Sequence, residues 1–533
     1  MTVNRARTTA AAFPLVAALS LAAVLLFQPA CRRRPPAVKH VIFFIGDGMS
    51  AETEVAASRY LYGRDDGLAW HTLPAKAYIA TWDVNVYNGN ARRAGRPPYS
   101  RSSFAPALGY DVRKDGPKPM AGPGASHRFP QGPATDSASS ATALSTGFKT
   151  DSGNIAWLPG DPPDGGLVTI AEEIRDKTGA GIGVISTVPF DHATPAAFVS
   201  HNTSRSAYYT GLKGHKGLGI ADEIILRTKP DVVIAGGSPL LDNPGFDAKK
   251  GYISESLYRT LQNSRDYVFV ERKQGQDGGR AIADGAVKAA REGRKLFGLF
   301  GGKGGNFEIP LVEDSPGRPR VTPGSEENPS LAEATEAALD DLGRDPDGFF
   351  LVIEQGDIDW ANHDNDFRAM VGCVADLDEA VRAALAFVDR PGDDIDWTNT
   401  VLLVTADHAT GGLFLEPGKT LGAGDLPRQD ARVDEGGPPA KVGSDRGVAN
   451  GAVITKPEYA SPYVYPDGDV SFGTAGHTNE LVDLAVVGAA TRSFLKLRGT
   501  WYPGPILDNT QINAALREAL GLAALGHHPR RAD

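Results

Sequence analysis

Side chains of the types that bind metal ions follow three short apolar runs of the sequence, each at the point where the run ends. They are Asp47 after residues 41–45, Glu354 and Asp359 after residues 349–353, and Asp407 and His408 after residues 401–404. One such residue alone is more often a helix cap or part of a turn. Because the arrangement occurs three times, it predicts a shared site for cations.

Two further histidines extend this set. His363 lies four residues after Asp359, so in a helical segment both side chains stand on one face and can share an ion. His477 lies in a loop of small residues, where it is either a ligand or a plain surface histidine. Nitrogen and oxygen ligands without thiolates suit zinc with open positions, or magnesium or manganese where oxygen dominates.

A run of small residues at 135–143 contains the best candidate for a nucleophile, Ser137. The run predicts a helix that begins near Ser137, where free backbone N–H groups favour both an alkoxide and a phosphate. No Gly-x-Ser-x-Gly motif accompanies this serine, so a metal ion would have to lower the pKa of its hydroxyl. The alternative is a serine that only caps the helix.

Arg205 is the candidate for binding an oxyanion. Its planar guanidinium can hold two phosphoryl oxygens at once. A single arginine is more often a surface residue, so this role depends on the other candidates lying nearby.

Short apolar runs and helical patterns alternate along the chain. Buried parallel strands are predicted at 41–45, 181–186, 232–235, 349–353, 401–404 and 484–487. Helices are predicted at 331–342, behind a Ser330 cap, and from Asp376 onward through Leu377, Val381, Leu385 and Val388. The alternation predicts an α/β fold with a doubly wound, mostly parallel sheet and helices on both faces. Ligands bind outside the carboxyl ends of the strands in such sheets.

The domain organisation follows from the same pattern. We expect one catalytic domain at 35–525 with a tail at 526–533. Three stretches rich in glycine and proline, at 85–134, 240–330 and 411–470, are interpreted as loops and insertions rather than separate domains, since none shows a core of its own.

Composition narrows the classes of protein. The 533 residues carry a formal net charge of -10, from 65 acidic and 55 basic side chains, which argues against a nucleic-acid-binding surface. Cys31 and Cys373 are the two cysteines of the sequence, so the mature protein has at most one disulfide if Cys31 is retained, and we expect none.

The N-terminus resembles an export signal, residues 1–34. Arg5 and Arg7 precede an apolar run, and Cys31 follows it. Three outcomes stay open: lipidation of Cys31, plain cleavage, or an uncleaved membrane anchor. We expect an exported protein that is periplasmic, anchored by a lipid at Cys31, or secreted.

Six segments, taken in order, resemble the alkaline phosphatase family, in particular its exported bacterial members. They are FIGDGM at 44–49, TDSASSATA at 135–143, HATPAA at 192–197 leading to His201 and Arg205, EQGDID at 354–359 with His363, TADH at 405–408, and GHT at 476–478. The resemblance implies the alkaline phosphatase-like fold and a metal-dependent phosphoric monoester hydrolase.

The resemblance also implies roles for single residues. Asp359, His363 and His477 would hold one zinc ion, and Asp47, Asp407 and His408 a second one beside Ser137. Asp47, Thr194 and Glu354 would hold a third ion, usually magnesium, and Arg205 would clamp the phosphate. Phosphate monoesters would be hydrolysed through a phosphoserine on Ser137, with release of inorganic phosphate and an alcohol.

Two positions depart from the pattern of some family members. Others carry Asp where this chain has His192, and Lys or His where it has Trp360. This His/Trp pair resembles certain bacterial members, and His192 beside the third site could loosen magnesium or admit zinc, so the third metal stays open. The resemblance also implies a homodimer.

Three alternatives remain. A sulfatase of the same superfamily would need proline and arginine shortly after the nucleophile, which the segment after Ser137 lacks. Phosphodiesterases of this superfamily generally resemble one another in having a threonine nucleophile and no arginine clamp. This chain has Ser137 and Arg205 at these positions. A non-catalytic phosphate- or metal-binding relic would have lost a ligand or the nucleophile.

Overall fold

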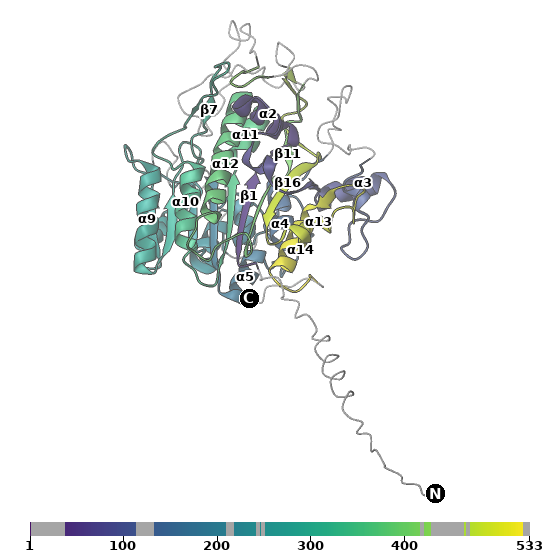
Figure 1. The fold of residues 1–533 in the computed structure, drawn as a ribbon, viewed down its shortest axis with the longest axis horizontal. Coiled ribbons are helices and arrows are strands. Elements are labelled where there is room, and N and C mark those ends of the chain that lie inside the picture. Colours follow the sequence, from purple (N-terminus) through teal and green to yellow (C-terminus); the bar gives the residue numbers. More distant parts are fainter. Residues whose placement is uncertain are drawn as a thin grey trace. The chain divides into compact units, whose positions relative to one another are not determined.

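A computed structural model gives the fold of the chain (Figure 1). It describes residues 1, 38–112, 133–208, 218–240, 246, 251–415, 421–427, 463–464 and 470–525. The chain divides into two units, Met1–Ala37 and Val38–Asp533, and the helices and strands of the described residues belong to the second unit. The predicted export signal, apart from Met1, and the predicted tail lie outside the described residues. Within the described part of the chain, no helix is long and apolar enough to cross a membrane.

A ten-stranded sheet forms the centre of this unit. In spatial order its strands are β17 (Ile506–Asp508), β2 (Ala75–Ala80), β16 (Val482–Gly488), β10 (Thr400–Thr405), β1 (His40–Gly46), β9 (Phe349–Gln355), β3 (Gly181–Pro189), β4 (Val232–Gly236), β6 (Lys295–Leu299) and β5 (Tyr267–Glu271). Strand β16 pairs antiparallel with both of its neighbours, and the other neighbouring pairs are parallel.

All six predicted strands are present, and one of them runs in an unexpected direction. The run 484–487 was predicted to be parallel, but it lies in the antiparallel strand β16. A strand that is buried between two neighbours has the same apolar run whether it is parallel or antiparallel to them. The sequence pattern could therefore not distinguish the two directions. The doubly wound, mostly parallel α/β fold is confirmed.

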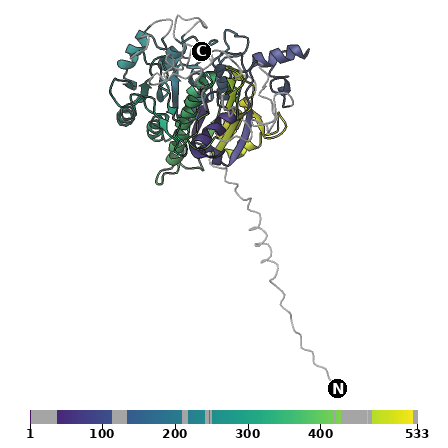
Figure 2. The same ribbon diagram turned by 90° about the horizontal axis from the view of Figure 1, so that it is seen from above.

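Two groups of helices pack around the sheet (Figures 1 and 2). In the first group, neighbours contact one another in the order α9 (Gly278–Glu292), α10 (Leu331–Leu342), α12 (Phe367–Val388) and α2 (Ala51–Tyr62). In the second, the order is α5 (Ile170–Thr178), α6 (Ala193–Val199), α4 (Ser137–Thr146) and α14 (Asn509–Ala519). The second group carries the predicted nucleophile.

Helix starts follow the sequence closely where a cap is present. The Ser330 side chain accepts a hydrogen bond from the Glu333 amide, and the Glu333 carboxylate accepts one from the Ser330 amide, so α10 begins with the capping box that the sequence predicts. Helix α12 begins at Phe367, before the predicted start at Asp376, because Asp366 caps it. Its first two turns are buried on most sides and therefore show no amphipathic period.

The stretch 240–330 differs from the expected loops and insertions. It contains α8 (Glu255–Gln262), β5, α9 and β6, and these two strands extend the main sheet at its edge. The glycines and prolines lie largely in the connections, and five-residue strands are too short to show a clear period.

The other two stretches hold smaller elements. Residues 85–134 include most of α3 (Val84–Arg93) and the 3-10 helix Pro106–Leu108. Residues 411–472 contribute a small sheet of β12 (Leu413–Leu415), β14 (Val470–Phe472) and β13 (Tyr463–Val464). Much of both stretches lies outside the described residues. The predicted domain boundaries stay predictions.

Short elements connect the larger ones. They are β7 (Leu311–Val312), β8 (Val321–Thr322), β11 (Ala409–Thr410), β15 (His477–Thr478), α7 (Ile220–Glu223), α11 (Asp357–His363), α13 (Thr491–Leu495), the 3-10 helix Ala69–Thr72 and the π-helix Ile224–Thr228. Three of them, α11, β11 and β15, lie at the edge of the main sheet where the predicted metal ligands are found.

The core lies around the central strands. Every residue of β1, β3, β9 and β10 is buried, as expected for parallel strands covered on both faces. The ends of these strands are therefore held firmly, and so are the side chains that follow them.

Candidate active site

The carboxyl ends of four neighbouring strands lie side by side. Strands β10, β1, β9 and β3 are consecutive in the sheet and parallel, so Asp407, Asp47, Asp359 and His192, which follow them, come to the same edge. A pocket of about 380 Å³ opens there. Its lining is Ser137, His192, Arg205, Asp359, Trp360, His363, Asp364, Ala475 and His477.

A first cluster joins Asp359, His363 and His477, whose ligand atoms lie within 4.8 Å of one another. Helix α11 places Asp359 and His363 on one face, with His363 Nε2 at 3.3 Å from Asp359 Oδ2. His477 Nε2 lies 3.5 Å from Asp359 Oδ1. The spacing of Asp359 and His363 in the sequence therefore produces the shared face that was expected.

Backbone carbonyls orient both imidazoles of this cluster. His363 Nδ1 lies 2.7 Å from the Ala475 carbonyl oxygen and His477 Nδ1 2.8 Å from that of Thr135, so each Nδ1 donates to a carbonyl and each Nε2 faces the cluster. Burial would raise the pKa of Asp359, but the two imidazoles hold it well below its usual range. Burial would lower the pKa of His477, but Asp359 raises it to about 9.

A second cluster joins Asp47, Asp407 and His408, all of them buried. His408 Nε2 lies 3.4 Å from Asp47 Oδ1, 3.3 Å from Asp407 Oδ2 and 3.2 Å from Ser137 Oγ. The Gly48 amide donates to Asp407 Oδ1 over 3.1 Å. The predicted nucleophile therefore lies at this cluster.

Gly48 allows the two clusters to approach each other. Its φ is 69°, and a Cβ atom there would lie 2.7 Å from Asp359 Cα and 2.8 Å from Thr410 Oγ1. Thr410 also contacts both clusters, because its hydroxyl donates to Asp359 Oδ1 and lies 3.2 Å from His408 Nδ1. A larger residue at position 48 would push the clusters apart.

A third group of oxygen atoms adjoins the second cluster. The Thr194 hydroxyl lies 3.5 Å from Asp47 Oδ2, and the Ser186 hydroxyl donates to Glu354 Oε2. Burial raises the pKa of Glu354 to about 7. Asp47, Thr194 and Glu354, which the family resemblance groups together, are thus all buried at the ends of β1, β3 and β9.

His192 and Trp360 lie at the rim of this third group. Their ring centroids are 6.1 Å apart. Burial, and next the charge of Arg205, lower the pKa of His192 to about 3, so its imidazole is neutral. Its Nδ1 is buried and has no hydrogen-bond partner among the described residues. A neutral imidazole with a lone pair of this kind suits a metal ligand.

The carboxylates of the site lack the partners that burial demands. Asp47 Oδ1, Glu354 Oε1 and Asp407 Oδ2 are buried without a hydrogen bond from any described residue. Burial, and next the charges of neighbouring carboxylates, raise the pKa of Asp47 well above its usual range and that of Asp407 to about 7. Buried anions so close together require cations. The donor set of carboxylates, imidazoles and a hydroxyl fits divalent metal ions.

Ser137 is the first residue of helix α4, as the sequence predicts, and Asp136 caps that helix. Asp136 Oδ1 accepts from the Ser139 and Gly153 amides, each at 3.0 Å, and Oδ2 accepts from Arg205 Nη1 at 2.9 Å. Burial would raise the pKa of Asp136, but Arg205 holds it well below its usual range. Asp136 thereby fixes Arg205 beside Ser137 in one pocket.

Some side chains that organise the site were not singled out from the sequence. Asp136 had a usable signal, because an aspartate directly before a helix of small residues is a typical N-cap. Thr410 and Ser186 had none, since their partners Asp359 and Glu354 are distant in the chain.

Comparison with known proteins gives consistent matches. The family model described as Alkaline phosphatase matches residues 124–486. A curated alkaline phosphatase of Escherichia fergusonii is 32% identical over 401 residues, which cover 71% of each chain. A cold-active alkaline phosphatase of Shewanella sp. has a similar structure, with a TM-score of 0.56 and 22% identity over 90% of this chain and 99% of that one. A histidine-to-aspartate mutant of TAB5 alkaline phosphatase, with Mg bound in its M3 site, has a TM-score of 0.54 and 19% identity over 92% of this chain and 100% of that one.

Proposed function

Since this chain belongs to the alkaline phosphatase family and is therefore a phosphatase, we propose that it hydrolyses phosphate monoesters with Ser137 as the nucleophile. The observation that carries the proposal is the position of Ser137 Oγ, 3.2 Å from His408 in the second cluster and in one pocket with Arg205. A nucleophile, an oxyanion clamp and a cation-binding group are the parts that phosphoryl transfer needs.

The residues of the site fit three metal ions. We propose zinc at Asp359, His363 and His477, zinc at Asp47, Asp407 and His408, and magnesium at Asp47, Thr194 and Glu354. The mixed nitrogen and oxygen donors of the first two groups and the all-oxygen third group support this division. Divalent ions bound there would lower the pKa of a nearby hydroxyl and neutralise the charge of the phosphoryl group.

The reaction divides into two displacements at phosphorus. Ser137 Oγ attacks the phosphorus in line with the ester oxygen, the bond from phosphorus to that oxygen breaks, and the serine proton ends on the leaving alcohol. Water then attacks the phosphoserine, which releases inorganic phosphate and restores the serine hydroxyl. Arg205, held by Asp136, binds two of the phosphoryl oxygens in both steps.

The third site carries a specific proposal about His192. Its neutral imidazole adjoins the group of Asp47, Thr194 and Glu354, whereas a carboxylate there would add a charge for a hard cation. The TAB5 mutant that exchanges histidine for aspartate has Mg in its M3 site. We expect His192→Asp to bind Mg2+ more tightly than the unaltered protein, measured by calorimetric titration after zinc loading; equal or weaker binding would remove His192 from this site.

The decisive experiment compares substrates on the full chain. We expect hydrolysis of p-nitrophenyl phosphate with zinc and magnesium, and much slower hydrolysis of the bis-(p-nitrophenyl) diester and of the sulfate ester. Ser137→Ala should lose nearly all activity and no longer trap phosphate covalently in acid-quenched samples. Ser145→Ala, a buried serine in the same helix, is the matched control and should keep both.

Each alternative predicts a different result. Preference for the diester or the sulfate ester would favour the other members of the superfamily. A folded, metal-loaded protein that leaves all three substrates intact would favour the non-catalytic relic. Zinc content, measured by mass spectrometry for His363→Ala and His408→Ala, tests the ligands separately: each variant should lose about one ion per chain.

Export, anchoring and assembly are further proposals. We propose that residues 1–34 direct export and that the protein is periplasmic, secreted, or held by a lipid on Cys31. Mass spectrometry of the mature N-terminus distinguishes lipidation from plain cleavage, and retention of the full signal would indicate a membrane anchor. We also propose a homodimer, which light scattering would reveal as twice the monomer mass.

A further inference from the structure

A second pocket lies at the other end of the helix that carries Ser137. Its volume of about 620 Å³ is within the range of pockets that hold small organic ligands. Gly147, the C-cap of α4, is part of its lining, whereas Ser137 is the first residue of α4. Ten helical residues rise about 15 Å, so this pocket is separate from the active site.

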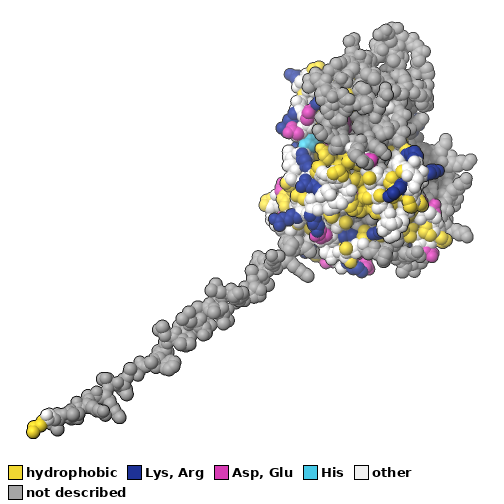
Figure 3. Space-filling model, turned by 90° about the vertical axis from the view of Figure 1, so that its right-hand side faces the viewer, with side chains coloured by type: hydrophobic (Ala, Val, Ile, Leu, Met, Phe, Trp, Pro, Cys, Tyr) yellow, Lys and Arg dark blue, Asp and Glu magenta, His cyan; other side chains and the backbone are white. Residues whose placement is uncertain are grey.

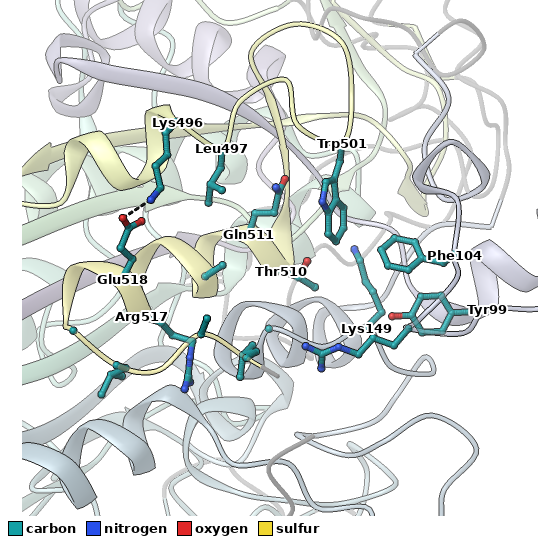
Figure 4. Close-up of a pocket in the computed structure, with 17 residues that line it drawn as sticks. Tyr99, Phe104, Lys149, Lys496, Leu497, Trp501, Thr510, Gln511, Arg517 and Glu518 are labelled. Atoms are coloured by element: carbon teal, nitrogen blue, oxygen red, sulfur yellow. Dashed lines mark ion pairs between the residues drawn. The ribbon is translucent and has the colours of Figure 1, made fainter. Parts of the chain in front are cut away.

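One end of the pocket is aromatic. Tyr99, Phe104 and Trp501 lie together there (Figure 4). The ring centroids of Phe104 are 5.0 Å from Trp501 and 5.3 Å from Tyr99, so the three rings form one wall. On the side of the molecule that carries α3 and α13, hydrophobic side chains gather on the surface with Lys and Arg side chains beside them (Figure 3).

Four basic side chains and one acidic one also line the pocket: Arg101, Lys149, Lys496, Arg517 and Glu518. Three of these cations have acidic partners. Lys149 Nζ lies 3.1 Å from Asp508 Oδ2, Arg517 donates two hydrogen bonds to Glu173 over 2.6 and 2.8 Å, and Lys496 pairs with Glu518 (Figure 4). These cations are therefore already neutralised within the protein.

Arg101 is the exception. Its guanidinium carbon lies 3.4 Å from the centroid of the Phe148 ring, which holds the group in place. Its Nη1 is buried and has no hydrogen-bond acceptor among the described residues. Burial also lowers the pKa of Arg101, as expected for a cation that pairs with none of the described acidic side chains. A buried donor of this kind is costly unless a ligand supplies the acceptor.

We propose that this pocket binds a small amphipathic anion, with a planar apolar body against Tyr99, Phe104 and Trp501 and one anionic group on Arg101. The aromatic wall excludes a fully hydrated ion such as free phosphate as the preferred ligand, because its rings would stay unused. The charge of Arg101, which no described acidic side chain neutralises, excludes a cation. The site is independent of the proposed hydrolysis at Ser137.

The test uses a pair of dyes with similar apolar bodies. Anilinonaphthalene sulfonate carries one anionic group, whereas phenylnaphthylamine is neutral. Calorimetric titration of the metal-loaded full chain should show one sulfonate site per chain and at least about tenfold weaker binding of the neutral dye, as the loss of a charge-assisted hydrogen bond predicts.

Variants locate the site. Arg101→Met should weaken binding of the sulfonate about tenfold and leave binding of the neutral dye nearly unchanged. Arg92→Met, an exposed arginine on α3, is the matched control and should change neither. Trp501→Leu should weaken the binding of both dyes. If Arg101→Met fails to fold, this variant shows whether the dyes bind in this pocket.

Two further results complete the test. Inorganic phosphate in excess should not displace the sulfonate, and Ser137→Ala should bind it as the unaltered protein does. Displacement by phosphate, absence of a stoichiometric site, or equal affinity in Arg101→Met and Arg92→Met would each overturn the proposal. None of these measurements depends on hydrolysis, so a failure of this pocket to bind the sulfonate leaves the proposed function untouched.

Discussion

Asp136→Asn should weaken the binding of inorganic phosphate while it preserves the fold. Asn still presents an oxygen to the Ser139 and Gly153 amides, and Asn and Asp are equivalent helix caps, so α4 should begin unchanged. The variant removes the anion that holds Arg205 Nη1 at 2.9 Å. Without this anion the Arg205 side chain would be mobile before phosphate binds, and each phosphate would have to fix it in place.

The magnitude follows from this ordering. The side chains of Arg205 and Asp136 are 27% and 18% exposed. Solvent therefore screens their attraction, and the loss of the ion pair itself adds little to the change in phosphate binding. Fixing one flexible side chain costs about 0.5–1.5 kcal/mol, which corresponds to binding about 2- to 12-fold weaker. We expect this increase in the inhibition constant of inorganic phosphate, measured against p-nitrophenyl phosphate hydrolysis.

Two outcomes would refute this reasoning. An unchanged constant would mean that Arg205 is ordered without Asp136. Tighter binding would mean that repulsion between the Asp136 carboxylate and the phosphate outweighs the orientation of Arg205. Asp136→Ala is the control, since it also loses the cap and should lower the free energy of unfolding by about 1 kcal/mol, whereas Asp136→Asn should not.

The remaining predictions concern stability. Chelation of the metal-loaded protein should lower its melting temperature, because ions that bind only the folded state stabilise it, and added zinc should restore it; an unchanged temperature in calorimetry would argue against ions in the buried clusters. Burial would lower the pKa of His201, but Glu172 and Glu223 raise it from 6.5 to about 10, so its contribution to stability is fully present below pH 6.5 and is lost as the pH rises through about 10. His201→Gln should therefore flatten the fall of the free energy of unfolding over that interval in urea titrations, and a slope equal to that of the unaltered protein would contradict this. Ser330→Ala should lose the cap it shares with Glu333 and lower the free energy of unfolding by about 1 kcal/mol, again by urea titration, with no change in hydrolysis.

The parts of the fold that could be predicted are those with a local cause. The strands of the sheet centre appear as apolar runs because both of their faces are covered, and α10 is bounded by its own capping residues. The direction of β16 and the placement of β5 and β6 depend on which strands they pair with, and that information is not local.

The candidate site shows the same division. Asp359 and His363 share a face because four residues separate them in α11, and Ser137 begins α4 because small residues follow a cap. Thr410 could not be found in this way. Its contacts with Asp359 and His408 arise only when β11 is placed beside α11.

The distance along the chain between the members of the site has a consequence for biosynthesis. Gly48 binds Asp407 across 359 positions of sequence, and Ser137 meets His408 across 271. A chain still emerging from the ribosome or from a translocon lacks His408 and His477 until most of its length has passed. A chain cut short before residue 408 therefore contains Ser137 and Arg205 yet cannot assemble the second cluster, so maturation of this centre must wait until synthesis is nearly complete.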